Sequence, residues 1–134
     1  MDTGSIDISA AGMRAQRLRM DVIATNLANA ETTSASLDGV RHVPYRRRTV
    51  AFAEGPKGPV ATVVEDPSPF RAEHQPDHPH AVTEGEDAGT VYFPNVHPIV
   101  ETVEMMLAAR AYEANLSAVD TAKAMNAAAL RILA

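Results

Sequence analysis

Cysteine and tryptophan are absent from this 134-residue chain, and phenylalanine and tyrosine together supply only 4% of it. Without cysteine there are no disulfides, no thiolate nucleophile and no cysteine-ligated zinc or iron–sulfur centre. With so few aromatic residues, large side chains to anchor a dense independent core are scarce. The hydrophobic fraction is 46%, but much of it is alanine, which buries little apolar area per residue.

Other missing features narrow the class of protein further. No run of about 18 apolar residues is present, so no membrane insertion is expected. The opening Met-Asp-Thr-Gly-Ser lacks a basic stretch followed by an apolar one, so we expect no cleaved secretory signal. A net charge of −5 disfavours nucleic acid as a partner. The length suits one domain, or a small module flanked by terminal helices.

What the chain does contain is helical periodicity at both ends. In residues 8–29, Ile8, Ala11, Ala15, Leu18 and Val22 recur at steps of three and four, which places them on one face of a helix. Asp7 or Ser9 is the predicted N-terminal cap. Glycine costs about 1 kcal/mol relative to alanine inside a helix, so Gly12 indicates either close packing or a later helix start.

The second helix is predicted over residues 98–133, with a proline in its first turn. Its apolar positions form a continuous stripe: Val100, Val103, Leu107, Ala111, Ala114, Ala118, Ala122, Met125, Ala129 and Ile132. A second stripe runs beside it: Met105, Ala109, Tyr112, Leu116 and Val119. Such a helix would be about 54 Å long, longer than a compact domain of this size needs. We therefore expect it to pack lengthwise against several neighbours.

Between the helices the pattern favours short strands and loops. Residues 45–52 and 60–65 are strand candidates that would pair as a hairpin, and residues 90–93 are a third. Residues 34–43 are predicted as a loop with a turn at Asp38-Gly39, and the acidic, His- and Pro-rich residues 73–89 as a mobile loop. The predicted fold is mainly α, with long terminal helices packed in a coiled-coil-like manner and a small β-containing middle. The predicted units are residues 1–33, 34–97 and 98–134.

No pattern indicates catalysis, a cofactor or a metal site. His74, His78 and His80 have a spacing that could in principle surround zinc, but Pro76 and Pro79 oppose a helix there, and a polar loop is the favoured interpretation. The Arg46-Arg47-Arg48 run is more typical of a solvated or salt-bridged patch than of a nucleic-acid site.

Five short motifs carry a family resemblance. Residues 22–33, VIATNLANAETT, are similar to the N-terminal signature of bacterial flagellar axial proteins. PYRR at 44–47, EDPSPFR at 65–71, PNV at 94–96 and RAYEAN at 110–115 narrow the resemblance to the proximal rod proteins of the flagellar basal body. The match covers most of the chain, in the expected order and spacing.

The resemblance implies a structural protein of the flagellum, not an enzyme. Such proteins are exported unfolded through the flagellar type III apparatus without a cleaved signal. They then polymerise in the periplasm, with copies of themselves and related rod proteins, into a drive shaft around the export channel. The terminal helices form the implied assembly interface, for which we select Leu18, Val22, Asn26, Leu27, Asn29, Val103, Leu107, Ala111, Tyr112, Ala114, Asn115, Ala118, Ala122 and Met125.

Two questions stay open from the residues alone. The helical stripes are compatible with a private two-helix core or with packing between chains, and the resemblance favours the second. Asn26 and Asn29 are interpreted as structural hydrogen-bonding residues, subunit contacts, or both. The alternative function is a small metal-binding or adaptor module that uses the histidine loop and forms a private homo-oligomer.

Overall fold

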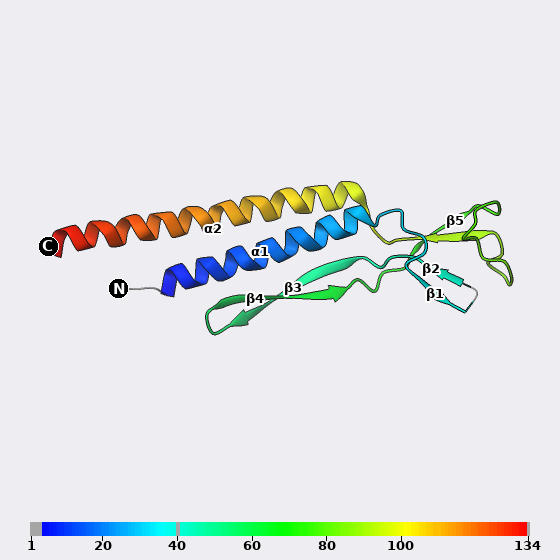
Figure 1. The fold of residues 1–134 in the computed structure, drawn as a ribbon, viewed down its shortest axis with the longest axis horizontal. Coiled ribbons are helices and arrows are strands. Elements are labelled where there is room, and N and C mark those ends of the chain that lie inside the picture. The colour runs from blue at the N-terminus through cyan, green and yellow to red at the C-terminus, as the bar shows by residue number, and fades with distance from the viewer. Residues whose placement is uncertain (1–3, 40, 134) are drawn as a thin grey trace.

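The computed structural model describes residues 4–39 and 41–133 and shows an elongated molecule built around two long helices (Figure 1). Helix α1 spans Gly4–Ala28 and helix α2 spans Pro98–Leu133, and six short strands lie between them in sequence. The mainly α fold with a small β-containing middle is therefore confirmed. Neither described helix is both long enough and apolar enough to cross a bilayer.

Helix α1 begins earlier than predicted. Because Ser5 and Ile6 do not break a helix, the described helix starts at Gly4, and the predicted caps Asp7 and Ser9 lie inside it. Asp7 still favours the helix N-terminus, as an acidic residue in the first turn. After Ala28 the chain makes a tight turn, in which the Asn29 side-chain amide donates to the Thr25 carbonyl at 2.9 Å.

The predicted central hairpin is confirmed. Strand β3, Arg48–Gly55, pairs antiparallel with strand β4, Gly58–Glu65, in a register that sets Arg48 opposite Glu65. Gly58 has a φ of 111°, a conformation that side chains rarely adopt. The strand starts at Arg48 and not at residue 45, because the backbone N–H groups of Tyr45 and Arg47 donate to the Thr32 carbonyl and the Asn95 side chain and not to a neighbouring strand.

The other two strand pairs were only partly predicted. Strands β1, Ser36–Asp38, and β2, Arg41–Val43, form a short hairpin where a loop was expected. Strand β6, Thr90–Phe93, was predicted, but its partner β5, Arg71–His74, was not. The sequence Arg-Ala-Glu-His has no apolar alternation, so only its pairing with β6 identifies it as a strand.

The residues between β5 and β6 form a sequence of turns tied to one another by backbone hydrogen bonds. The Gln75 N–H donates to the Gly89 carbonyl, and the Gly89 N–H to the Val82 carbonyl, both at 2.8 Å. Val82 is buried. This segment therefore closes on itself, beyond the ends of the two long helices (Figure 1).

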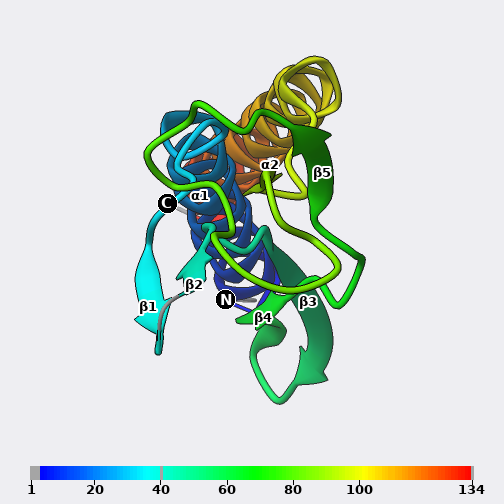
Figure 2. The ribbon, with the colours of Figure 1, turned by 90° about the vertical axis from the view of Figure 1, so that its right-hand side faces the viewer.

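Helix α1 lies between α2 on one side and the β3–β4 hairpin on the other (Figures 1 and 2). Its buried residues are small or medium in size, among them Ala11, Gly12, Ala15 and Val22. The close approach to α2 explains Gly12, because a Cβ built there would lie 2.9 Å from the Asn115 side-chain nitrogen. Of the two interpretations of Gly12, close packing is the one confirmed.

Helix α2 is covered on one side only. The side against α1, here called the seam, includes fully buried Glu101 and Ala108, nearly buried Val119 and half-buried Asn115. The second predicted stripe contributes Val119 to this seam, whereas much of the first stripe lies away from it. We call the large apolar residues on the opposite side the outer face of α2; each is 51% to 85% exposed: Ile99, Val100, Val103, Met106, Leu107, Met125 and Ile132.

Candidate functional site

A cluster of buried and half-buried polar side chains lies where α1 ends and α2 begins. We call it the polar junction, and it consists of Asn26, Tyr45, Arg47, Asp66, Asn95 and Glu101. These residues come from four segments that are far apart in sequence. The junction therefore holds both helices and the middle of the chain together.

Asn26 is the centre of the junction and is completely buried. Its amide nitrogen donates to the Arg48 carbonyl at 2.7 Å and to Glu101 Oε2 at 3.0 Å. Its amide oxygen accepts from the Tyr45 hydroxyl at 2.9 Å and from the Arg48 N–H at 3.0 Å. An asparagine amide has two donor hydrogens and two acceptor lone pairs, so Asn26 makes every hydrogen bond available to it.

Glu101, in the first turn of α2, is completely buried and is held by Arg47 as well as by Asn26. The Arg47 guanidinium donates through Nε to Glu101 Oε1 at 2.6 Å and through another nitrogen to Asp66 Oδ2 at 3.0 Å. Burial disfavours the charged guanidinium, but the hydrogen bonds to Glu101 and Asp66 outweigh this and raise the pKa of Arg47. The positive charge of Arg47 thus lies against the carboxylates of both Glu101 and Asp66.

The polar junction shifts the pKa values of Asp66 and Tyr45. The Ser68 backbone N–H, which donates to Asp66 at 2.9 Å, is the largest cause of a lowered Asp66 pKa, and Arg47 adds to it. Burial raises the pKa of Tyr45 and keeps its hydroxyl a donor to Asn26. Asp66 is therefore stabilised as a carboxylate and Tyr45 as a neutral phenol.

Asn95 connects the start of α2 to residues 66–69, which include two prolines. Its oxygen accepts from the Arg47 N–H at 2.8 Å, and its nitrogen donates to the Ser68 hydroxyl at 2.8 Å. Arg46 lies over the Phe70 ring, 4.2 Å from its centroid, and donates to the Asp66 carbonyl. The arginine run is thus a salt-bridged and hydrogen-bonded patch, which was the favoured interpretation.

The predicted assembly residues fall into three groups. Val22 and Asn26 are buried within the chain. The half-buried residues include Asn115 in the seam and Leu18 beside β4; the others are Leu27, Asn29, Ala111, Tyr112 and Ala122. Exposed residues lie on α2 away from α1: Val103, Leu107, Ala114, Ala118 and Met125.

Sequence reasoning did not find the junction as a site. It gave Glu101 no role in a site and treated Arg47 as part of a solvated or salt-bridged arginine run. The available signal was that four of the five family motifs contain junction residues: Asn26, Tyr45 with Arg47, Asp66, and Asn95. Nothing in the one-dimensional spacing shows that these motifs meet.

The sequence favoured a polar loop for the histidines, and in the structure three of the histidines contact one another. His42 stacks on His80 with ring centroids 4.2 Å apart, and His80 meets His78 edge-on at 5.3 Å. Thr33 and Ser34 hydroxyls bond to Nδ1 of His80 and His42. Across residues 4–39 and 41–133, no three His, Asp or Glu side chains are placed to hold a metal ion. The metal-binding alternative therefore finds no support.

Comparison with known proteins places these features in a class. Residues 6–35 match the family model described as flagella basal body rod protein, and residues 87–132 match the one described as flagellar basal body rod FlgEFG protein C-terminal. The two matches include nearly all of α1 and of α2. The chain is thus of the flagellar basal-body rod class.

Whole-chain relatives identify the branch of that class. The flagellar basal-body rod protein FlgC of Borreliella burgdorferi is 38% identical, with 96% of this chain and 95% of the relative covered. FlgC of Bacillus subtilis is 36% identical with the same coverage, and FlgC of Salmonella typhimurium is 36% identical over 89% and 88%. The chain belongs to the FlgC family of flagellar basal-body rod proteins and is a structural rod subunit.

Proposed function

We propose that the polar junction and the outer face of α2 have separate roles in rod assembly. The junction fixes α2 against α1 within one chain. The outer face of α2 packs against other copies of this chain and against related rod proteins. The observation that carries the proposal is the row of large apolar side chains left exposed along α2, at positions such as Val103, Leu107 and Met125.

The energetics favour covering this face. Full burial of a valine, leucine or methionine side chain stabilises by about 1.5–3 kcal/mol each, and Val103 and Leu107 are 52% and 53% exposed. Apolar patches of this kind on a folded chain mark protein-interaction surfaces. The alanines among them, Ala114 and Ala118, permit a second helix to approach closely.

The predicted interface residues divide accordingly. Exposed Val103, Leu107 and Met125 supply direct contacts between subunits, and half-buried Leu18 and Leu27 supply further contacts from α1. Val22 and Asn26 act indirectly, because they hold α1 in place.

Family membership supports the remaining parts of the proposal. The chain leaves the cytoplasm through the flagellar export apparatus without a cleaved signal and polymerises in the periplasmic part of the basal body. Its role there is mechanical rather than enzymatic.

The test is a charge placed on the outer face, Leu107→Asp. The residue is half exposed in the single chain, so folding is expected to be unchanged, whereas assembly requires a buried carboxylate and is expected to fail. Swimming in soft agar and the presence of the protein in purified basal bodies are the measurements. The matched control is Leu37→Asp on β1, where the leucine is 66% exposed. Normal motility of the Leu107 variant would refute the proposal.

A further inference from the structure

Sulfur occurs in this chain only in methionine side chains, because cysteine is absent. The structure describes five of the six methionines, and these five fall into two groups. Met13, Met20 and Met105 are half-buried. Met106 and Met125, both in α2, are 56% and 68% exposed. The two most exposed methionines of the described chain therefore lie on the same helix.

Both of these methionines belong to the outer face of α2. Met106 and Met125 are 19 residues apart in the helix, which corresponds to about 28 Å along its axis. The other five residues of the outer face are valine, leucine or isoleucine, whose side chains contain only carbon and hydrogen. Met106 and Met125 are therefore the two positions of the outer face that a mild oxidant can change.

Oxidation alters how a methionine side chain interacts with its surroundings. Hydrogen peroxide transfers one oxygen atom to the thioether sulfur, so the sulfur is oxidised to a sulfoxide and the peroxide is reduced to water. The flexible apolar side chain becomes polar, and burying a polar group without a hydrogen-bond partner is unfavourable. Methionine sulfoxide reductases reverse the change. The reaction can thus act reversibly on an apolar interface.

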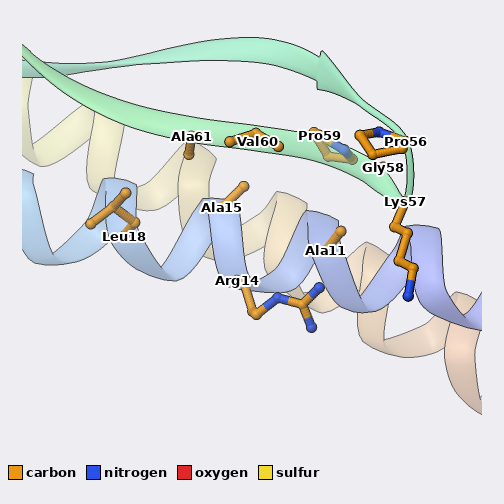
Figure 3. Close-up of a pocket in the computed structure, with 10 residues that line it drawn as sticks. All are labelled: Ala11, Arg14, Ala15, Leu18, Pro56, Lys57, Gly58, Pro59, Val60 and Ala61. Atoms are coloured by element: carbon orange, nitrogen blue, oxygen red, sulfur yellow. The ribbon is translucent and has the colours of Figure 1, made fainter.

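The packing within the single chain does not involve these two sulfur atoms. Between α1 and the hairpin, Ala11 and Ala15 lie beside Pro59 and Ala61, and none of the residues that line this contact contains sulfur (Figure 3). The buried residues of the seam contain no sulfur either. Oxidation of the two exposed methionines is therefore expected to leave the fold of the subunit intact and to change only its outer face.

We propose that Met106 and Met125 are oxidation sites that regulate assembly of the subunit. In the free subunit both thioethers react with peroxide, and the sulfoxides prevent the outer face of α2 from packing against a neighbouring subunit. Packing covers both side chains, so the unassembled subunit is sensitive and the assembled one is protected. The inference rests on the proposed role of the outer face and adds a modification that acts on it.

Two double variants separate the oxidation chemistry from the packing. Met106→Leu with Met125→Leu removes both sulfur atoms but keeps apolar side chains of similar volume, so assembly is expected to be normal. Met106→Gln with Met125→Gln puts a polar amide in the place of each sulfoxide and is expected to lower the yield of basal bodies about tenfold. The matched control is Leu37→Gln on β1, at a leucine that is 66% exposed. Normal assembly of the double glutamine variant would overturn the inference.

Peroxide treatment tests the oxidation step itself. The purified chain and purified basal bodies are treated with the same concentration of hydrogen peroxide, and peptide mass spectrometry measures the sulfoxide at each methionine. In the free chain, Met106 and Met125 should oxidise severalfold faster than the half-buried Met105. In basal bodies both should oxidise severalfold more slowly than in the free chain. Equal oxidation of Met106 and Met125 in the two states would contradict the protection by packing.

A measurement in cells links the modification to assembly. When synthesis of the chain is induced in the presence of sublethal peroxide, the double leucine variant should form more basal bodies than the natural chain, and equal numbers would refute the regulation. The proposed function is tested separately by Leu107→Asp. If Leu107→Asp fails to assemble but the double glutamine variant assembles normally, the role of the outer face stands and the oxidation sites do not.

Discussion

The two long helices have opposite relations to their surroundings. Helix α1 is covered on two sides, by α2 and by the β3–β4 hairpin, and its remaining side presents charged residues such as Arg14, Arg17 and Asp21. Helix α2 is covered on one side, and its remaining side is apolar. In α1 most large apolar residues are covered at least in part by the chain itself, although Ile8 is 55% exposed, whereas many of the large apolar residues of α2 face away from the chain.

The residues in the seam between the helices explain this difference. Most of the groups that α2 packs against α1 are small or polar, such as Ala108, Asn115 and Glu101. The single chain therefore depends on close packing and on hydrogen bonds, and its larger apolar side chains stay available for other subunits. Substitutions in the seam should then lower the stability of the isolated chain, and substitutions on the outer face should not.

The largest loss of stability is expected for Asn26→Ala. It removes four hydrogen bonds and leaves buried groups of Glu101, Tyr45 and Arg48 without partners, at about 1–3 kcal/mol for each unsatisfied group. We expect the free energy of unfolding of the dilute chain to fall by about 4 kcal/mol. Denaturant unfolding followed by circular dichroism is the measurement. Asn29→Ala loses only local hydrogen bonds and should cost about 1 kcal/mol. If Asn26→Ala and Asn29→Ala lower the free energy of unfolding equally, the polar junction has no special role in stability.

A smaller loss is expected where the helices come closest. Gly12→Val places new carbons against the Asn115 side chain, and overpacking of this kind costs about 2 kcal/mol. In an Asn115→Ala background the same change should cost less than about 1 kcal/mol, since the opposing side chain is gone. A double-mutant cycle from thermal or denaturant unfolding measures the difference. If the Gly12→Val cost is the same in both backgrounds, the contact with Asn115 is not its cause.

The polar junction also predicts that the stability of the chain depends on pH. The Ser68 N–H, together with Arg47, lowers the folded-state pKa of Asp66 below its ordinary value of 3.8. The resulting stabilisation is fully present above the unfolded-state pKa and is lost as the pH falls through the lower, folded-state pKa. Asp66→Asn should therefore be less stable than the natural chain at pH 7, and the gap should narrow below about pH 4. A gap that stays constant across this range would contradict the role of the Asp66 charge.

The helices were predictable from the sequence because periodicity reports local geometry. Residues 98–133 were predicted with the boundaries that α2 has, and the β3–β4 hairpin followed from two β-rich runs around a proline-glycine turn. Strand β5 was missed, because its residues have no strand pattern without their partner β6. The polar junction was missed for a related reason. Asn26 and Glu101 are 75 residues apart, and a pattern in one segment carries no information about which distant segment it meets.

Two valines of α2 allow the comparison of its two sides with a single chemical change. Val119 lies in the seam and is 6% exposed, whereas Val103 lies on the outer face and is 52% exposed. Val119→Ala should destabilise the isolated chain by about 2 kcal/mol, from the lost burial and the remaining cavity. Val103→Ala should change it by no more than about 0.5 kcal/mol, as surface substitutions do. In assembled rods the stability losses of the two variants should become more similar, because subunit packing then buries Val103 as well. A large loss for Val103→Ala in the dilute monomer would mean that the outer face already supports the single chain, and that it is not reserved for neighbouring subunits.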